Sequence, residues 1–370
     1  MLAQIKSLGF NTIRIPFANE MLRNTSSTNG ISFQANPDLY GLSPLQCLDK
    51  IISYSGNISL RVLLDRQSSK SNGAGTEALW YVPNDPYYTE KRIVSDLVIL
   101  AKRYLGTAVI GLDLWNAPGS GATWGTGSAL TDWNLAAERF GNAIQAVNPY
   151  LLIIVQGIQN GNDLTGVAEK PVKLSVPAQV VYSTPEYSND LYVHDYFSDP
   201  IFPANLRDIW TARFGYLIME QIAPVIISEF GTSFANPSDT PWLSTWMNYL
   251  NGQFLEDGQS QLPPGHMGIS WSYQQLAPYG PVGGILGSDW QTVQSQKLTA
   301  IASGLGPLFP FVDRSVPFVP PPANKTSVVP DPTLTPTAAP TQYPYEYFHT
   351  SGNQIVNREG KTIRIAGVNW

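Results

Sequence analysis

A chain of 370 residues, of which 43% are hydrophobic and only 14% charged, is long enough for one large, well-filled domain with an appended segment. The formal charge of −6 and the pI near 5.1 argue against a nucleic-acid partner, and no apolar run reaches the roughly 18 residues of a membrane span. The sequence has a single cysteine, Cys47, which excludes a disulfide within the chain. It has three histidines, His194, His266 and His349, which are too few for a histidine-rich metal site, so we expect neither metal nor cofactor.

From the first residues onward, short β-branched runs alternate with stretches whose apolar residues recur at spacings of three and four, as in 133–140. Such alternation predicts a parallel sheet covered by helices, that is, an α/β fold. Seven runs are one short of the eight strands of a (β/α)8 TIM barrel. The runs cover 11–17, 60–65, 109–115, 151–155, 180–183, 225–228 and 267–271.

The missing strand is expected at the carboxyl end. Residues 314–346 are rich in Pro and Thr and carry no core pattern, which is typical of a linker. Residues 347–370 predict a hairpin with a turn near Asn357–Gly360, followed by a strand over 362–368. We therefore expect three parts, namely a barrel that lacks one strand (1–313), a linker (314–346) and a hairpin with the completing strand (347–370).

Several blocks in this order resemble the cellulase family, glycoside hydrolase family 5. They are Ile5–Arg14, Gly111–Asn116, Ser228–Gly231, Gly283–Leu286 and Asp289–Thr292. The tail 347–370 resembles the amino-terminal hairpin and first barrel strand of that family. The resemblance implies a (β/α)8 barrel that hydrolyses β-linked glucans with retention, and a chain that is circularly permuted or strand-exchanged.

A retaining glycosidase needs two carboxyl groups, one as nucleophile and one as acid and base. The resemblance implies that Glu229 is the nucleophile. It places the acid/base glutamate directly after Asn116, where this chain has Ala117. Alanine carries no proton, and the loss of general acid catalysis costs about 10²–10⁴ in rate.

Four further positions depart from the family pattern. Gln67, Gly119 and Pro185 stand where the family has histidines, and Gln156 stands where it often has a glutamate. Drift after the loss of selection for chemistry accounts for such a group of changes better than a deliberate knockout does.

The resemblance also implies sugar-binding roles for Arg14, Asn116, Tyr187 and Trp271. For three of them a purely structural reading stays open: Arg14 as a buried strand-end pair, Tyr187 as a loop aromatic and Trp271 as packing at the barrel top. Glu186 and Asp113 are nearby carboxylates that could replace the missing acid, and His194 reads as a loop histidine rather than a catalyst.

A barrel without its first strand has two open edges, which invite strand addition. The tail can return to its own barrel or complete a neighbour's, and roughly 30 proline-rich residues reach on the order of 90 Å. Donation to a neighbour would produce self-association through 347–370 and an open filament. The same order of segments would also arise if the sequence were one repeat cut from a longer tandem array of such barrels.

Two hypotheses follow. The first is an extracellular, catalytically impaired protein with a structural, filament-forming or carbohydrate-binding role. The second is a weakly active retaining endo-β-1,4-glucanase with a β-glucan ligand. No signal peptide opens the sequence, but the acceptor triplets at Asn24, Asn57 and Asn324 favour glycosylation and secretion.

Overall fold

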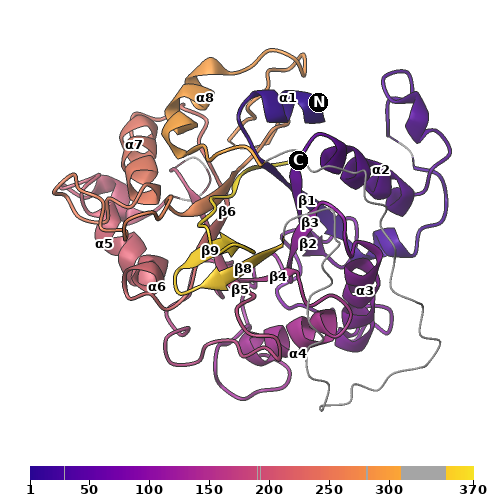
Figure 1. Ribbon diagram of the computed structural model, residues 1–370. Coiled ribbons are helices and arrows are strands. Elements are labelled where there is room, and N and C mark those ends of the chain that lie inside the picture. Colours follow the sequence, from indigo (N-terminus) through magenta and orange to yellow (C-terminus); the bar gives the residue numbers. More distant parts are fainter. Residues whose placement is uncertain (29, 190, 192, 281, 310–346) are drawn as a thin grey trace.

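The computed structural model describes residues 1–28, 30–189, 191, 193–280, 282–309 and 347–370 (Figure 1). Among these residues, eight parallel strands form one closed barrel in the order β1, β2, β3, β4, β5, β6, β7, β10. The predicted TIM barrel is therefore confirmed. Its strands are β1 (Thr12–Ala18), β2 (Arg61–Ser68), β3 (Val109–Asp113), β4 (Leu152–Gln156), β5 (Val180–Tyr187), β6 (Val225–Gly231), β7 (Ser270–Tyr273) and β10 (Ala366–Asn369).

Helices lie around the outside of the barrel (Figure 1). They are α1 (Leu2–Ser7), α2 (Pro44–Asn57), α3 (Glu90–Arg103), α4 (Trp133–Gln145), α5 (Leu206–Trp210), α6 (Tyr216–Met219), α7 (Asp239–Leu250) and α8 (Ser295–Ile301). The start of α2 shows why the sequence folds this way locally, because Ser43 and Gln46 form a capping box around Pro44. The alternation is not strict, however, since residues 157–179 between β4 and β5 contain no helix.

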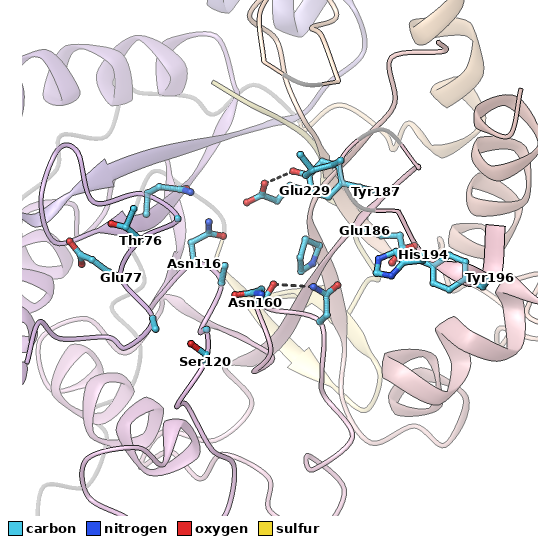
Figure 2. Close-up of a pocket in the computed structure, with 18 residues that line it drawn as sticks. Thr76, Glu77, Asn116, Ser120, Asn160, Glu186, Tyr187, His194, Tyr196 and Glu229 are labelled. Carbon is cyan, nitrogen blue, oxygen red and sulfur yellow. Dashed lines mark hydrogen bonds between the residues drawn. The ribbon is translucent and has the colours of Figure 1, made fainter. Parts of the chain in front are cut away.

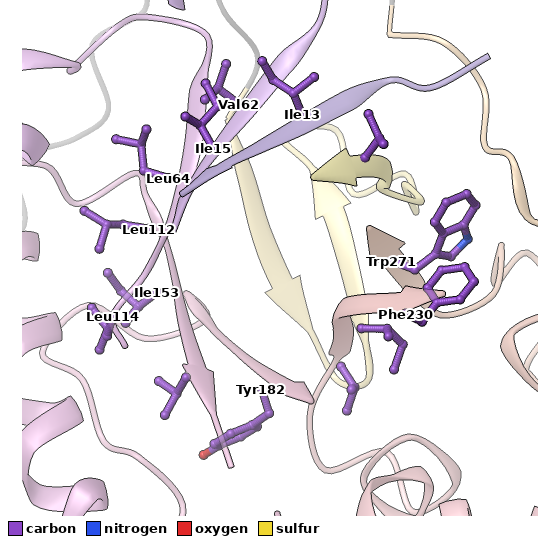
Figure 3. Packing of buried hydrophobic residues seen from close by; sticks show 14 of the residues in the cluster. Ile13, Ile15, Val62, Leu64, Leu112, Leu114, Ile153, Tyr182, Phe230 and Trp271 are labelled. Atoms are coloured by element: carbon purple, nitrogen blue, oxygen red, sulfur yellow. The ribbon is translucent and has the colours of Figure 1, made fainter. Parts of the chain in front are cut away.

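The core has two layers that follow from the alternation of side chains along each strand. One set of residues packs against the surrounding helices, and Figure 3 shows Ile13, Val62, Leu112 and Phe230 among them. The other set forms a separate apolar cluster that includes Leu63, Ile110, Leu152, Ile154, Val181, Ile226 and Ile365.

Polar side chains replace apolar ones as the strands approach their carboxyl ends. On β2, Asp65 lies two residues beyond Leu63, and on β4, Gln156 lies two residues beyond Ile154. Residues two apart share a face of a strand, so these polar groups continue the row of the inner apolar cluster. This change from apolar to polar marks where the site lies.

The strand β10 closes the barrel of its own chain. It pairs in parallel with β1, where Thr12 lies opposite Gly367, and with β7, where Trp271 lies opposite Ala366. The Asn11 side chain forms hydrogen bonds with the backbone at the start of β10. Its Nδ2 donates to Arg364 O and its Oδ1 accepts from Ala366 N, both at 2.9 Å. In this structure both edges left by the missing strand are occupied without a neighbouring molecule.

The tail differs in detail from the sequence prediction. The expected strand over 362–368 is shorter and later, at Ala366–Asn369. The strands β8 (Phe348–Ser351) and β9 (Gln354–Asn357) form a hairpin that reverses at 352–353. The predicted turn at Asn357–Gly360 is present as a second reversal, where Asn357 N donates to Lys361 O at 2.9 Å and an antiparallel bridge pairs Val356 with Thr362. Phe348 and Ile355 join the inner apolar cluster, which means that the hairpin covers one end of the barrel core. The expected linker 314–346 lies outside the described residues.

Candidate active site

A pocket of about 410 Å³ opens at the carboxyl ends of the strands. Parallel barrels place their reactive groups at this end, because the loops that follow the strands meet there. Glu229, Tyr187, Asn116 and Ala117 line the pocket, and Figure 2 shows Tyr187 directed at Glu229. The structure thus brings together four of the residues that the sequence singled out.

Glu229 lies within β6 and is reachable from the pocket, with 14% of its side chain exposed. The Tyr187 hydroxyl donates to its Oε2 at 2.5 Å. Arg14 Nη1 lies 3.5 Å from its Oε1. Both carboxylate oxygens are therefore held in place by donors, which fixes the orientation of the carboxylate.

Arg14 is buried and balances more than one acid. Its Nη2 lies 2.9 Å from Asp65 Oδ1 and 2.8 Å from Asp113 Oδ2, in addition to the contact with Glu229. Burial alone would lower the pKa of Arg14, but the three carboxylates together raise it above its usual value. Arg14 is thus a buried ion-pair partner of two aspartates and also contacts Glu229. These contacts agree with both interpretations of this residue, as a buried ion pair and as a residue of the site.

Asp65 and Asp113 both form ion pairs with the one guanidinium of Arg14. Burial raises the pKa of Asp65 well above its usual range, although Arg14 opposes the shift. Burial also raises the pKa of Asp113, again against Arg14. Sequence reasoning did not assign Asp65 a role; its place at the carboxyl half of a strand was the available signal.

The wall formed by Asn116, Ala117 and Gln156 carries no charge of its own. Ala117 presents only a methyl group, and its backbone adopts φ 55°, in the left-handed region. Gln156 Oε1 accepts from Ala117 N at 2.9 Å, while its Nε2 donates to Asn116 Oδ1 at 2.7 Å. From the sequence, Gln156 is identified only as a departure from the family pattern. In the structure its side chain forms hydrogen bonds to both other residues of this wall.

The other departures lie in the same pocket, since Gln67, Gly119 and Pro185 all line it. Gly119 N donates to Ala78 O at 2.8 Å, and a Cβ on Gly119 would lie 3.2 Å from Asn160 Oδ1. A larger side chain at position 119 therefore needs its neighbours to shift.

Trp271 is not a sugar platform in this structure, which corrects the role implied by the resemblance. It is fully buried, its Nε1 donates to Gly304 O at 3.0 Å, and its ring packs edge-on against Phe10 and Phe230. Trp271 does not line the pocket, and Figure 3 shows it beside Phe230 in the hydrophobic cluster. The structural reading of Trp271 as packing is the one that agrees with these contacts.

The carboxylates considered as replacement acids are engaged elsewhere. Glu186 Oε2 accepts from Arg213 Nη1 at 2.9 Å, and Figure 2 shows it beside His194 and Tyr196 rather than beside Glu229. Asp113 is held by Arg14. His194 is exposed at the pocket rim and stacks on Tyr196, with ring centres 4.7 Å apart, as expected of a loop histidine. Among the described residues no group of three or more acidic, histidine or cysteine side chains could hold a metal ion.

Comparison with known proteins places this site in a family. A sequence model described as Cellulase (glycosyl hydrolase family 5) matches residues 1–272. The chain belongs to glycosyl hydrolase family 5. An endoglucanase from Paenibacillus polymyxa is 39% identical over 307 residues, which cover 79% of this chain and 72% of that protein.

Two further cellulose-degrading relatives by name, an endoglucanase and an endocellulase, are also similar to this chain. The major extracellular endoglucanase of Xanthomonas campestris pv. campestris is 36% identical, over 81% of this chain and 61% of its own length. The solved catalytic domain of the Xanthomonas campestris enzyme has a TM-score of 0.71 at 34% identity, with 82% of this chain and 86% of that one covered. An endocellulase from Pyrococcus horikoshii, solved in complex with cellotetraose, has a TM-score of 0.71 at 34% identity, with 81% and 84% covered.

These relatives correct the first functional hypothesis. The sequence departures favoured a catalytically impaired protein with a structural or filament-forming role, but relatives at 36–39% identity are endoglucanases. The departures concern a few pocket residues, whereas the similarity to these two relatives extends over 79% and 81% of the chain. Among the described residues, no helix is both apolar and long enough to traverse a bilayer.

Proposed function

We propose that the chain is a weakly active retaining endo-β-1,4-glucanase whose ligand is a β-glucan. The observation that carries the proposal is the setting of Glu229, whose two oxygens are held by Tyr187 and Arg14 at the base of an open pocket. The endoglucanase relatives and the cellotetraose complex of the Pyrococcus horikoshii enzyme support the same substrate class.

In the proposed first step, a Glu229 oxygen attacks the anomeric carbon and the bond to the leaving sugar breaks. The leaving oxygen takes its proton from a water molecule beside Ala117, because a methyl group has no proton to give. In the second step, water attacks the anomeric carbon from the face that the leaving sugar vacated, and the bond to the Glu229 oxygen breaks. The hydroxide left by the first step takes the proton of the attacking water, and the configuration is retained. The lack of a side-chain acid explains why turnover is expected to be slow, by about 10²–10⁴.

The purified chain tests this with two substrates, cellotetraose and 2,4-dinitrophenyl β-cellobioside. We expect slow cleavage of cellotetraose and faster release of dinitrophenol, which needs no protonation, with azide accelerating the second step and yielding a β-glycosyl azide. Glu229→Gln should abolish all cleavage, whereas Glu220→Gln, at an exposed site, should leave it unchanged. Absence of cleavage of both substrates, with and without azide, would overturn the proposal.

We also propose that residues 347–370 act as the hairpin and first strand of the family barrel, as in a circular permutation, joined to 1–313 by the segment 314–346. The pairing of β10 with β1 and β7 supports this arrangement. It makes self-association through the tail unnecessary. A monomeric mass in light scattering would agree with it, and a tail-dependent oligomer would contradict it.

Secretion completes the proposal. The Xanthomonas campestris relative is named an extracellular enzyme, and Asn24 and Asn57 are exposed, as glycan acceptors must be. Asn324 lies outside the described residues. A mass decrease on enzymatic deglycosylation of the protein secreted from eukaryotic cells would test both acceptor sites.

A further inference from the structure

The tail 347–370 contacts the barrel at both of its ends. At the carboxyl ends of the strands, Trp370 N donates to Arg14 O at 3.1 Å. The preceding residue, Asn369, donates from Nδ2 to Ser228 O at 3.3 Å, and Ser228 comes directly before the proposed nucleophile. At the other end of the barrel, the hairpin of β8 and β9 covers the core (Figure 1). The position of the hairpin can therefore affect the contacts that the tail makes beside the pocket.

His266 contacts this hairpin from the turn 263–268, which lies just before β7. Its Nδ1 accepts from Gly268 N at 3.0 Å, and its Nε2 lies 3.4 Å from Asn353 O. A backbone N–H can only donate, so Nδ1 carries no proton. The ring proton is therefore on Nε2, which donates it to Asn353 O. Both contacts together require the neutral imidazole in this one tautomer.

Asn353 lies at the reversal between β8 and β9 and is buried. Its Nδ2 donates to Ile218 O on α6 at 2.8 Å. The tip of the hairpin is thus joined to the barrel by a polar contact to α6 and another to His266. Loss of the contact to His266 leaves the carbonyl oxygen of a buried residue without that donor, which costs more than the hydrogen bond itself contributes.

A positive charge on His266 would lie close to a buried cation of the tail, Arg364. The guanidinium of this arginine donates to three neutral oxygen atoms, namely Leu250 O, Ile269 O and Asn251 Oδ1. A Cβ on Gly268 would lie 2.8 Å from Arg364 Cζ. The residue whose N–H binds His266 therefore packs directly against the guanidinium, and a second positive charge there is unfavourable.

The elements that form this contact contribute no acidic side chain. The turn 263–268, α6, β8 and β9 contain none, and the other histidine of the hairpin is His349 on β8. Burial lowers the pKa of His266, the hydrogen bond to Asn353 opposes this shift, and Arg364 lowers the pKa further. For a base with a lowered folded pKa, the contribution to stability is complete above the unfolded pKa of about 6.5 and is lost as pH falls toward the folded pKa.

We propose that His266 is a pH-dependent switch that holds the tail hairpin on the barrel when neutral and releases it when protonated. A proton on Nδ1 would face the N–H of Gly268, donor against donor, so the ring must turn and its contact with Asn353 is broken. Release of the hairpin loosens the start of β10, and with it the hydrogen bonds to Arg14 and Ser228. The switch needs no substrate and does not depend on the proposed glucanase function.

Hydrogen exchange of the full chain, read by mass spectrometry at pH 7.5 and pH 5.0, tests the switch. Exchange rates are corrected for the intrinsic effect of pH, and protection in peptides from 347–369 is compared with protection in α3. Tail protection relative to α3 should fall at least about fivefold at pH 5.0, the lower end of what one coupled binding event produces. Unchanged relative protection would overturn the proposal.

Two neutral substitutions separate titration from packing. His266→Asn can still accept from Gly268 N, and His266→Gln can still donate to Asn353 O, but neither side chain can gain a proton. In both variants relative tail protection should be the same at the two pH values, whereas His349→Gln should behave as wild type. Variants that keep the pH dependence of wild type would contradict the switch.

A readout on the wild-type chain covers the case in which a variant does not fold. In ¹⁵N NMR, the imidazole of His266 should carry its proton on Nε2 at pH 7.5, and the side-chain NH₂ signals of Asn353 should shift as the ring gains its second proton. A proton on Nδ1 at pH 7.5, or Asn353 signals that ignore the titration of His266, would also overturn the proposal.

Discussion

The two walls of the pocket differ in what they do with charge. Around Glu229, one buried arginine, two aspartates and a tyrosine hydroxyl form a connected network. Across from it, Asn116, Ala117 and Gln156 form an equally well-connected network that is neutral. In the proposed mechanism the first wall holds the nucleophile, and the second orients the sugar but has no proton to deliver. The difference teaches that charge is confined to one wall, although two contacts join the walls: Arg14 Nη2 lies 3.3 Å from Asn116 Oδ1, and Gln156 Nε2 donates to Asp113 Oδ2 at 3.2 Å.

The largest effect should come from giving the neutral wall an acid. Ala117 already adopts φ 55°, so Ala117→Glu adds no backbone strain beyond that of any residue with a Cβ. We expect kcat/KM for cellotetraose to rise by about 10²–10⁴, because general acid catalysis of leaving-group departure is restored. The kcat/KM for dinitrophenyl cellobioside, which reports the first step and needs no acid there, should change far less.

Ala129→Glu is the matched control, since Ala129 is exposed in the same loop between β3 and α4. It should leave both substrates unaffected. If Ala117→Glu accelerates both substrates equally or neither, then the two walls are not separable as acid side and nucleophile side.

A smaller effect should follow from weakening the charged wall. Tyr187→Phe removes the hydroxyl that donates to Glu229 Oε2 at 2.5 Å. A hydrogen bond to a charged group is worth about 1.5–3 kcal/mol, so kcat/KM should fall about 10- to 100-fold for both substrates. Tyr54→Phe, at a surface position on α2, should have no effect. A loss confined to cellotetraose would assign Tyr187 to the leaving-group side of the reaction.

Much of the charged wall was predictable from the sequence. Glu229 and Arg14 lie on strands whose β-branched runs are strong local signals, and the (β/α)8 order fixes that their carboxyl ends meet. The eighth strand was also foreseen at the tail, though not its bounds, because Gly367 and Asn369 lack the β-branched side chains that mark a strand.

The rest of the site depends on contacts between distant segments. The resemblance implied that Trp271 binds a sugar ring. Side chains alternate between the two faces of its short strand, so a shift of one residue in the register reverses the face on which Trp271 lies. The role of Gln156 depends on the three atoms that surround its amide, which come from β3 and the loop after it. Periodicity carries no information on such contacts.

The smallest effect concerns Asp65, one of the two aspartates that contact Arg14 in the charged wall. Burial raises the pKa of Asp65 well above its usual value. For a carboxyl whose folded pKa is raised, the contribution to stability is fully present below the unfolded pKa of about 3.9 and is lost as pH rises through the folded pKa. Asp65→Asn removes this titration. The variant should match wild type near pH 4 and become progressively more stable relative to it as pH rises through the folded pKa of Asp65.

Urea unfolding at pH 4, 6 and 8 measures this difference, with Asp38→Asn at an exposed position as the control. A variant that instead becomes less stable than wild type at pH 8 would mean that Arg14 needs Asp65 as an anion. In that case the charged wall would hold three ionised carboxylates on one guanidinium, and Glu229 would stand in a field that opposes its own negative charge. Asp65, Asp113 and Glu229 lie 2.9, 2.8 and 3.5 Å from the guanidinium of Arg14, and burial opposes the charged form of both aspartates, so the three acids compete for one positive charge.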